Sequence, residues 1–277
     1  MKFFAEKVSL KKKKIKVLLS ASSGSGKTYG ALRLAYGMTK DWSKIFVIDT
    51  ERGSSTLYKS LGDFMFVNFE PPYTPQNYIE AIKYCNSQGA EVIIIDSITH
   101  EWSGKGGCLD IHASYGGKFQ DWAAVTPMHL EFIDAICSVD SHVICTVRRK
   151  EEHILNDQNG KKVVEKKGLA EQTRDGFSYE MDIVFEIDNQ NNLCRVTKNR
   201  TQLFKEDPPF LLTEETGNSL LEWANIGISE LDVALIEIRE STDKNQLKVI
   251  FNKYKNLQSN EDFLELLKLK KENLENK

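Results

Sequence analysis

The feature that most constrains this chain is a short glycine- and serine-rich segment, Ala21-Ser22-Ser23-Gly24-Ser25-Gly26-Lys27-Thr28. An apolar run, Ile15–Leu19, precedes it, and a stretch with helical periodicity, Tyr29–Lys40, follows it. The two glycines allow the backbone to turn its N–H groups inward, where they can bind phosphate oxygens. The N-terminus of the following helix adds a favourable dipole. The segment therefore predicts a strand, a phosphate-binding loop and a helix, in that order.

Two residues of this loop have direct chemical roles. The Lys27 ammonium can reach the terminal phosphates of a nucleoside triphosphate, and the Thr28 hydroxyl can ligate Mg²⁺. Ala21 stands where the pattern has its first glycine, but its side chain is small enough to be tolerated. A turn without a ligand is the alternative, which the flanking strand and helix disfavour. The residues expected to contact the nucleotide, ATP, are Ala21, Ser22, Ser23, Gly24, Ser25, Gly26, Lys27, Thr28 and Tyr29.

Apolar strands alternate with helices beyond this loop, which predicts an α/β fold with a mostly parallel, doubly wound sheet. The further strands are expected at Ile45–Ile48, Val92–Ile95 and Val143–Val147, and helices are expected to begin at Thr74-Pro75 and Thr126-Pro127. The alternation of strands and helices ends at Arg148, where the chain becomes polar and rich in turn residues.

The second half of the chain has a different character. A hairpin signal, Asp157-Gln158-Asn159-Gly160, interrupts the polar stretch, and strands are expected at Asp182–Ile187 and Leu193–Thr197. From Ser229 onward the pattern is helical. We therefore expect a nucleotide-binding α/β domain at residues 1–227 and a small helical tail at residues 228–277.

Three acidic residues are candidates for metal binding and catalysis. Asp96 follows a buried strand, at the edge of a parallel sheet where ligands collect, and is expected to hold Mg²⁺ through water. Glu51 lies just beyond another strand and is the preferred carboxylate for positioning an attacking water. Glu101 is its competitor. An ordinary surface acid remains the alternative for both glutamates.

Composition limits the remaining possibilities. The formal charge of −3 means that a nucleic-acid partner would need a local basic surface. The five cysteines are scattered without a C-x-x-C pair, which favours a reducing cytoplasm over disulfides or a zinc site. No signal-peptide pattern and no apolar stretch of about 18 residues is present, so neither export nor a membrane span is expected.

The acidic motifs and a later basic pair resemble those of a known superfamily. Ile48-Asp49-Thr50-Glu51 with Ile95-Asp96-Ser97 resembles the paired motifs of the RecA and RadA recombinases, and Val196-Thr197-Lys198-Asn199-Arg200 resembles the strand-end Lys-x-Arg of DnaB-type hexameric helicases. From about Lys14 to Gly227 the chain most resembles phage-encoded RecA-like ATPases, a group that includes short single-strand annealing proteins. This likeness rests on Ser97-Ile98-Thr99-His100-Glu101-Trp102, Val147-Arg148-Arg149-Lys150, Gln172-Thr173-Arg174-Asp175-Gly176-Phe177-Ser178-Tyr179-Glu180 and Lys198-Asn199-Arg200-Thr201.

The resemblance implies a RecA-like P-loop NTPase core that binds ATP and Mg²⁺, with Glu51 as catalytic base. It also implies that Lys198 and Arg200 reach across a subunit interface to a neighbour's triphosphate, in a ring or a filament. A phage-encoded protein of this kind would work in the bacterial host cytoplasm. The sequence has Thr146-Val147 where RecA proteins carry an Asn-Gln pair, so the RecA switch between nucleotide and DNA cannot be transferred to this chain.

The resemblance further implies contact with single-stranded DNA in two loops, Trp102–Thr126 and Arg148–Tyr179, because the loops after the third and fourth strands of a RecA-like core face the central axis. Glycine pairs, aromatic residues and positive charges in the first segment suit a stacking platform. A solvated insertion is the alternative. The residues expected to contact DNA are Lys105, Lys118, Arg148, Arg149 and Lys150.

Three functions remain open from the sequence. The first is a DNA-stimulated ATPase that acts on single-stranded DNA in phage recombination or annealing, with a single-strand-binding protein as a further partner. The second is a module that uses ATP to assemble on a partner and turns over little. The third is a P-loop kinase of a small metabolite, which the basic pair Lys198 and Arg200 disfavours because it suits an oligomer.

Overall fold

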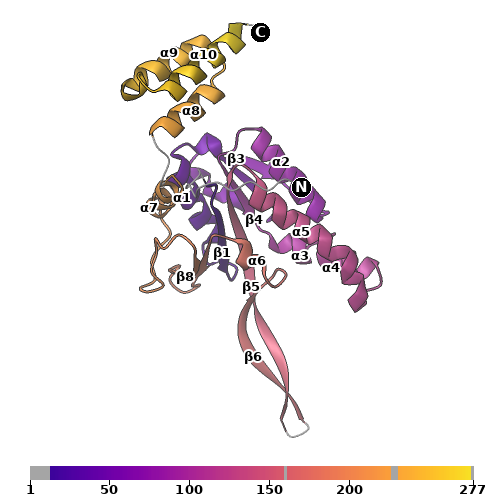
Figure 1. Ribbon diagram of the computed structural model, residues 1–277. Coiled ribbons are helices and arrows are strands. Elements are labelled where there is room, and N and C mark those ends of the chain that lie inside the picture. Colours follow the sequence, from indigo (N-terminus) through magenta and orange to yellow (C-terminus); the bar gives the residue numbers. More distant parts are fainter. Residues whose placement is uncertain (1–12, 159–160, 226–229, 276–277) are drawn as a thin grey trace. The chain divides into compact units, whose positions relative to one another are not determined.

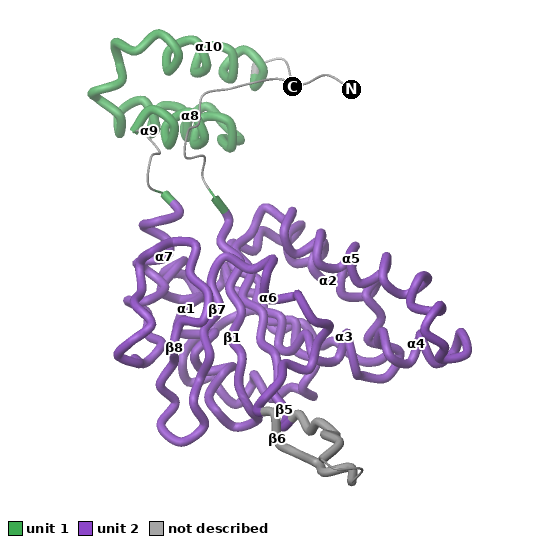
Figure 2. The backbone as a smooth tube through the Cα atoms, turned by 60° about the horizontal axis from the view of Figure 1, so that its bottom comes forward, with its two compact units in different colours: residues 1–13, 225–277 green, residues 14–224 purple. Residues whose placement is uncertain are grey.

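The computed structural model describes residues 13–158, 161–225 and 230–275. The chain forms two compact units: Lys14–Ala224, called the core unit here, and Met1–Lys13 with Asn225–Lys277, called the C-terminal unit (Figure 2). The domain boundary predicted near Gly227 falls within residues 226–229, outside the described part of the chain. Each unit is described by itself below.

The core unit is built on a mostly parallel sheet with the strand order β3-β2-β4-β5-β1-β7-β8 (Figure 1). Its strands are β1 (Lys16–Ala21), β2 (Ile45–Asp49), β3 (Met65–Asn68), β4 (Val92–Asp96), β5 (His142–Gln158), β7 (Ile183–Ile187) and β8 (Cys194–Asn199). Every neighbouring pair in this order is parallel except β7 and β8. Strands β1, β2 and β4 are buried along their whole length, as expected when helices cover both faces of a parallel sheet. The predicted α/β architecture is confirmed.

Helices cover the two faces in pairs, with α1 (Lys27–Thr39) and α7 (Glu214–Ala224) on one side and α2 (Pro75–Ser87) and α5 (Trp122–Ser138) on the other (Figure 1). A hydrophobic core lies on each face of the sheet. Successive residues of each buried strand pack in different cores, because side chains alternate across a strand. Gly37 of α1 and Gly217 of α7 let these two helices approach closely, since a Cβ at either position would overlap the backbone of the other helix. The shorter elements are η1 (Trp42–Lys44), η2 (Ser54–Leu61), α3 (Thr99–Ser103), α4 (Cys108–Ser114), η3 (Phe119–Asp121) and α6 (Phe177–Glu180).

Two expectations about the core unit were wrong. The helix predicted to begin at Thr126-Pro127 begins at Trp122, and Pro127 lies inside it. Trp122 stacks on Trp102 and His112, with ring centroids 5.4 and 4.0 Å apart, and this packing anchors the earlier start of the helix.

The segment after Arg148, expected to be a polar loop that contains a hairpin turn, forms long strands on both sides of that turn and is an extended hairpin. Strand β5 continues to Gln158 and pairs antiparallel with β6 (Lys161–Glu171), with a register shift between Glu152 and His153. Backbone pairing satisfies the hydrogen bonds of the two arms, so even charged sequences form strands there. The second half of the hairpin signal, residues 159–160, lies outside the described residues.

The C-terminal unit contains α8 (Glu230–Glu240), α9 (Lys244–Lys253), η4 (Lys255–Leu257) and α10 (Glu261–Glu275), which confirms the predicted helical segment. Its own small core consists of Ala234, Ile238, Leu247, Ile250, Tyr254 and Phe263. In the described parts of both units, no helix is long and apolar enough to cross a membrane.

Candidate nucleotide site

The predicted phosphate loop connects the carboxyl end of β1 to the first turn of α1. Gly24 and Gly26 adopt left-handed backbone conformations, with φ of 83° and 78°, which a side chain would disfavour. Gly26 is also the residue from which α1 starts. Ala21, at the position of the missing glycine, is the last residue of β1 and is buried. Tyr29 lies partly exposed on the first turn of α1, where its hydroxyl accepts a hydrogen bond from Arg33.

Lys27 is a buried cation held by neutral groups. Its Nζ donates to the carbonyl oxygens of Ala21 at 3.1 Å and Ser22 at 2.7 Å. Among the described residues, no carboxylate forms an ion pair with it. Burial lowers the pKa of Lys27 to about 8; nearby Asp96 opposes this shift and Arg148 adds to it. A phosphate group bound by the loop would therefore give the Lys27 ammonium a negatively charged partner.

Asp96 ends β4 with both carboxylate oxygens occupied by hydroxyl donors. Thr28 Oγ1 donates to Oδ2 at 2.6 Å, and Thr146 Oγ1 donates to Oδ1 at 2.5 Å. Burial raises the pKa of Asp96, while the two hydroxyl hydrogen bonds act in the opposite direction. The predicted Mg²⁺ ligands Thr28 and Asp96 are thus in direct contact.

Glu51 lies on a turn shaped by the carboxylate of Asp49. Asp49 Oδ1 accepts hydrogen bonds from the backbone N–H groups of Glu51 at 2.7 Å and Gly53 at 3.1 Å. The Glu51 side chain accepts a hydrogen bond from Ser97 Oγ at 3.1 Å, next to Asp96 in the chain, and forms an ion pair with Arg148. The structure therefore brings Lys27, Thr28, Asp96 and Glu51 to one edge of the sheet, as the sequence predicts.

The sequence profile of the AAA domain family matches residues 13–210. The chain belongs to this family. A KaiC-like protein from the hyperthermophilic archaeon Pyrococcus horikoshii is 17% identical, with a TM-score of 0.41 over 73% of this chain and 88% of that one. None of the curated proteins compared with the chain matches it. The AAA domain carries a P-loop ATPase core, in a family that generally binds ATP and Mg²⁺.

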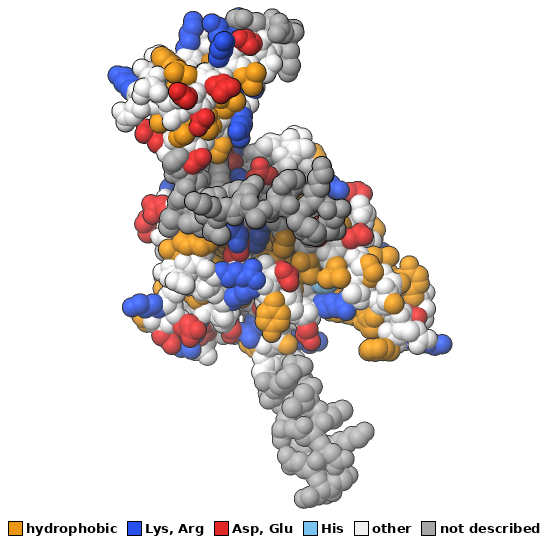
Figure 3. Space-filling model, viewed as in Figure 1, with side chains coloured by type: hydrophobic (Ala, Val, Ile, Leu, Met, Phe, Trp, Pro, Cys, Tyr) orange, Lys and Arg blue, Asp and Glu red, His pale blue; other side chains and the backbone are white. Residues whose placement is uncertain are grey.

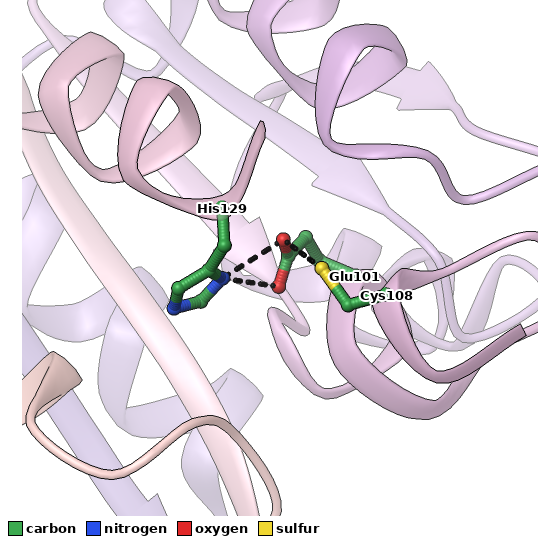
Figure 4. Close-up of side chains that lie close together, drawn as sticks. All are labelled: Glu101, Cys108 and His129. Carbon is green, nitrogen blue, oxygen red and sulfur yellow. Dashed lines mark hydrogen bonds and ion pairs between the residues drawn. The ribbon is translucent and has the colours of Figure 1, made fainter. Parts of the chain in front are cut away.

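Glu101, the competing carboxylate in this AAA domain, lies in a separate buried cluster (Figure 4). Its oxygens accept hydrogen bonds from His129 Nδ1, at 3.0 and 3.1 Å, and from Cys108 Sγ at 3.1 Å. The three side chains have potential metal-ligating atoms within 4.8 Å of one another. Burial raises the pKa of the Cys108 thiol, which favours the neutral donor over a thiolate ligand. The cluster is satisfied by its own hydrogen bonds.

The basic pair at the end of β8 lies far from the phosphate loop of its own AAA domain. Lys198 Nζ donates to the carbonyl oxygen of Ser178 at 3.0 Å and also contacts that of Tyr179. Arg200 donates to the Tyr179 carbonyl at 3.0 Å and lies 3.9 Å from Asp182.

Strand register shows why the pair is remote. Lys198 pairs with Val184, and Val184 pairs with Leu18 in the first half of β1, whereas the phosphate loop leaves the other end of β1. Because β8 runs antiparallel, its carboxyl end lies at the opposite edge of the sheet. The structure does not bring Lys198 or Arg200 to the nucleotide site of the same chain.

The residues expected to contact DNA fall into two groups. Arg148 and Arg149 are engaged inside the chain, Arg148 with Glu51 and Arg149 with Glu186. Lys150, Lys105 and Lys118 are exposed. The first group therefore lies beside the nucleotide site instead of on an open loop.

Several contacts that order the site escaped the sequence analysis. Thr146, noted only as a departure from RecA, is a hydrogen-bond donor to Asp96. Thr50 Oγ1 contacts the Asp96 and Ser97 carbonyl oxygens at 3.2 Å and His100 Nδ1 at 2.7 Å. Burial lowers the pKa of His100. The available signal for Thr50 was a hydroxyl side chain directly after the apolar strand β2.

Proposed function

We propose that this protein hydrolyses ATP and that Glu51 positions the attacking water. The observation that best supports this function is the chain of contacts at one edge of the sheet. The phosphate loop supplies Lys27 and Thr28, Thr28 donates to Asp96, and Glu51 is bonded to Ser97, the residue after Asp96. A phosphate-binding loop, a metal-binding carboxylate and a water-positioning carboxylate are the parts that phosphoryl transfer to water requires.

The donor set fits Mg²⁺. This ion prefers hard oxygen ligands, and the Thr28 hydroxyl oxygen lies 2.6 Å from a carboxylate oxygen of Asp96. Mg²⁺, when bound, offsets the charge that develops on the phosphates. Lys27 adds a second cation, because exchanging its two neutral carbonyl partners for phosphate oxygens gives it a charged partner.

Arg148 restrains Glu51 in this proposal. The carboxylate that should position water is paired with the Arg148 guanidinium, so Glu51 becomes available only when Arg148 moves. Arg148 lies where β5 leaves the central sheet and enters the β5–β6 hairpin, beside Arg149 and the exposed Lys150. A polyanion bound near these residues would compete with Glu51 for Arg148. Single-stranded DNA is such a polyanion, so its binding would release Glu51 and stimulate hydrolysis.

The test of the water-positioning role compares two isosteric substitutions. Glu51→Gln should preserve ATP binding and lower kcat by about 10²-fold or more, because the amide cannot position and polarise water as the carboxylate does. Glu101→Gln, in the cluster with His129 and Cys108, is the matched control and should retain kcat. If the two variants fold equally well and Glu101→Gln shows the loss, the proposed site is incorrect.

The restraint has its own test. Arg148→Met keeps the length of the side chain and removes the charge, so it should raise the DNA-free ATPase rate and abolish stimulation by oligo(dT). A variant that is slower without DNA would show that Arg148 assists the reaction directly. Arg239→Met, which removes an exposed arginine of α8 in the C-terminal unit, is the control.

The segment Trp102–Thr126 supports a DNA-binding role. Phe119 is 92% exposed and Tyr115 is 53% exposed, and the exposed Lys105 and Lys118 lie in the same segment. Exposed aromatic rings beside lysines suit single-stranded nucleic acid, whose bases stack while its phosphates pair. Phe119→Ala should weaken oligo(dT) binding, by fluorescence anisotropy, without changing ATP affinity. Leu57→Ala, at an exposed leucine of η2, is the control.

We also propose assembly into a ring or a filament. Lys198 and Arg200 lie at the edge of the sheet opposite their own phosphate loop, so any triphosphate that they contact would be a neighbour's. A mixture of Lys27→Ala and Arg200→Ala proteins should recover ATPase activity, because some interfaces pair an intact loop with an intact arginine. Native mass in ATP must show that the two variants co-assemble. Co-assembled mixtures without recovery would exclude the role in trans.

A second candidate function is an ATP-dependent assembly module with little turnover. The ion pair between Glu51 and Arg148 favours it, because a restrained base also keeps hydrolysis slow. ATP-driven assembly with a low ATPase rate that oligo(dT) leaves unchanged would select this function over the first. Activity in phage recombination or annealing would be tested by strand annealing with complementary oligonucleotides, with and without a single-strand-binding protein.

A further inference from the structure

Helices α9 and α10 of the C-terminal unit form a groove with a regular pattern of side chains. Each helix contributes residues at positions i, i+3, i+4 and i+7, which place them on one helical face. The groove has a volume of 760 Å³ and is lined by Lys244, Leu247, Lys248, Phe251 and Asn252 of α9 and by Leu264, Leu267, Lys268 and Lys271 of α10. This feature lies wholly within the C-terminal unit.

The floor of the groove is apolar and backed by the core of the unit. Leu247 is buried, whereas Phe251 and Leu264 are 36% and 40% exposed. Phe251 stacks on the fully buried Phe263, with ring centroids 6.3 Å apart, and Leu267 packs against the same core. The floor is therefore held in place by packing and offers apolar surface to a partner.

The walls of the groove carry only positive charge. Its lining includes four lysines, two from each helix, and no aspartate or glutamate. On the face seen in Figure 3, exposed hydrophobic side chains of this unit lie among both basic and acidic side chains, so the absence of acids is a property of the groove lining alone. The chain as a whole has a formal charge of −3, so this concentration of lysines is local. A ligand for the groove needs apolar anchors flanked by negative charges.

We propose that this groove docks an acidic amphipathic peptide segment of a partner protein. The stripe from i to i+7 on each helix is about 10 Å long, which matches two turns of a helical peptide or its two or three anchor side chains. Three of the four apolar lining residues are leucines, which suit aliphatic or aromatic anchors better than stacked bases. A groove with lysines on both walls also fits a narrow peptide better than the flat surface of a membrane.

The probe is a fluorescein-labelled acidic peptide of about 14 residues with Leu and Phe at i, i+3 and i+4 spacing. Full-length protein should bind it, by anisotropy, with an affinity that falls as salt is added. Two probe controls separate the contributions: the same peptide with Ala at the anchors, and a peptide with Lys in place of its acids. Both should bind at least about tenfold more weakly.

Variants of the protein locate the binding site. The double charge reversal Lys248→Glu with Lys271→Glu, and separately Phe251→Ser, should each weaken peptide binding by about tenfold or more. Lys255→Glu, an exposed lysine of the same unit outside the groove, should leave it unchanged. Circular dichroism and ATP affinity should match the parent protein in all three, which separates loss of docking from loss of folding.

Several results would overturn the proposal. They are equal binding of the acidic and basic peptides, equal loss with Lys255→Glu, and retention of binding in both groove variants. Groove-dependent binding of oligo(dT) or phosphatidylserine vesicles, in the absence of peptide binding, would assign the surface to another ligand. A change of oligomeric state in Phe251→Ser without any peptide binding would assign it to a second copy of the chain. ATPase measurements do not enter this test, so its failure leaves the proposed ATPase function untouched.

Discussion

Nucleotide affinity should depend on pH through Lys27. The nucleotide-free site holds this ammonium with a pKa of about 8, because burial disfavours its charge. Bound phosphates favour the charged form, so binding must protonate any Lys27 that is neutral. With that pKa, roughly nine-tenths of sites are charged at pH 7 and roughly one-tenth at pH 9. ATP affinity should therefore fall by about tenfold over this range, which corresponds to about 1.4 kcal/mol.

Calorimetry in buffers of different ionisation enthalpy gives a direct measurement. At pH 8, ATP binding should take up about half a proton, and the uptake should vanish near pH 6. Lys27→Arg is the control, since arginine stays charged throughout this range. Burial also lowers the pKa of Lys16 to about 8. Because the Lys27→Arg variant keeps Lys16, any pH dependence that Lys16 causes would remain in the variant. A flat affinity profile in the parent protein, or an equal decline in Lys27→Arg, would refute the reasoning.

Three further predictions concern stability and are checked by urea unfolding without nucleotide. Thr146→Val removes one of the two hydroxyl donors to buried Asp96 and should lower the free energy of unfolding by about 1–3 kcal/mol. Mg²⁺-dependent ATP binding should also weaken. An unchanged free energy of unfolding and unchanged ATP affinity would show that a water replaces the hydroxyl. Gly37→Ala should destabilise the core unit by at least about 1–3 kcal/mol because its Cβ overlaps the backbone of α7. At Gly30 on the same helix, the tightest contact of a Cβ is a methyl of Leu212 at 3.2 Å, so Gly30→Ala should be tolerated. Phe263→Ala should lower the stability of the C-terminal unit by about 3–5 kcal/mol while ATP affinity is retained; an equal loss of ATP binding would contradict the separation into two units.

The α/β core could be predicted because its local and long-range signals agree. The apolar run Val92–Ile95 has no polar alternation, and only a strand buried on both faces suits such a run. The turn of the β5–β6 hairpin was signalled by the sequence, but its two long strands and the helix start at Trp122 were missed for a shared reason. The start of the helix depends on stacking with Trp102, 20 positions earlier, and the hairpin depends on pairing between its arms. Neither interaction leaves a periodic pattern in the local sequence.

The candidate site divides in the same way. Lys27, Thr28 and Asp96 could be placed from the sequence because each has a fixed position relative to a strand end or the loop. Arg148 could not, because its contact with Glu51 joins the middle of β5 to the turn after β2, and these strands are not neighbours in the sheet. Its charge suggested an external anion, whereas the folded chain supplies an internal carboxylate.

The direction of a single strand determines what the basic pair can do. In a parallel sheet, every strand ends at the same edge, so Asp96, the phosphate loop and the Glu51 turn are gathered there. Strand β8 is antiparallel to β7, so its carboxyl end carries Lys198 and Arg200 to the opposite edge. No side-chain rearrangement could return them across the length of the sheet to their own nucleotide. Either they hold the Ser178 and Tyr179 carbonyls for stability alone, or they act on the triphosphate of another copy. A role in trans would leave each of Lys27→Ala and Arg200→Ala nearly inactive alone and restore ATPase activity in co-assembled mixtures. A stability role would instead leave folded Arg200→Ala protein active by itself, and adding Lys27→Ala would give no gain.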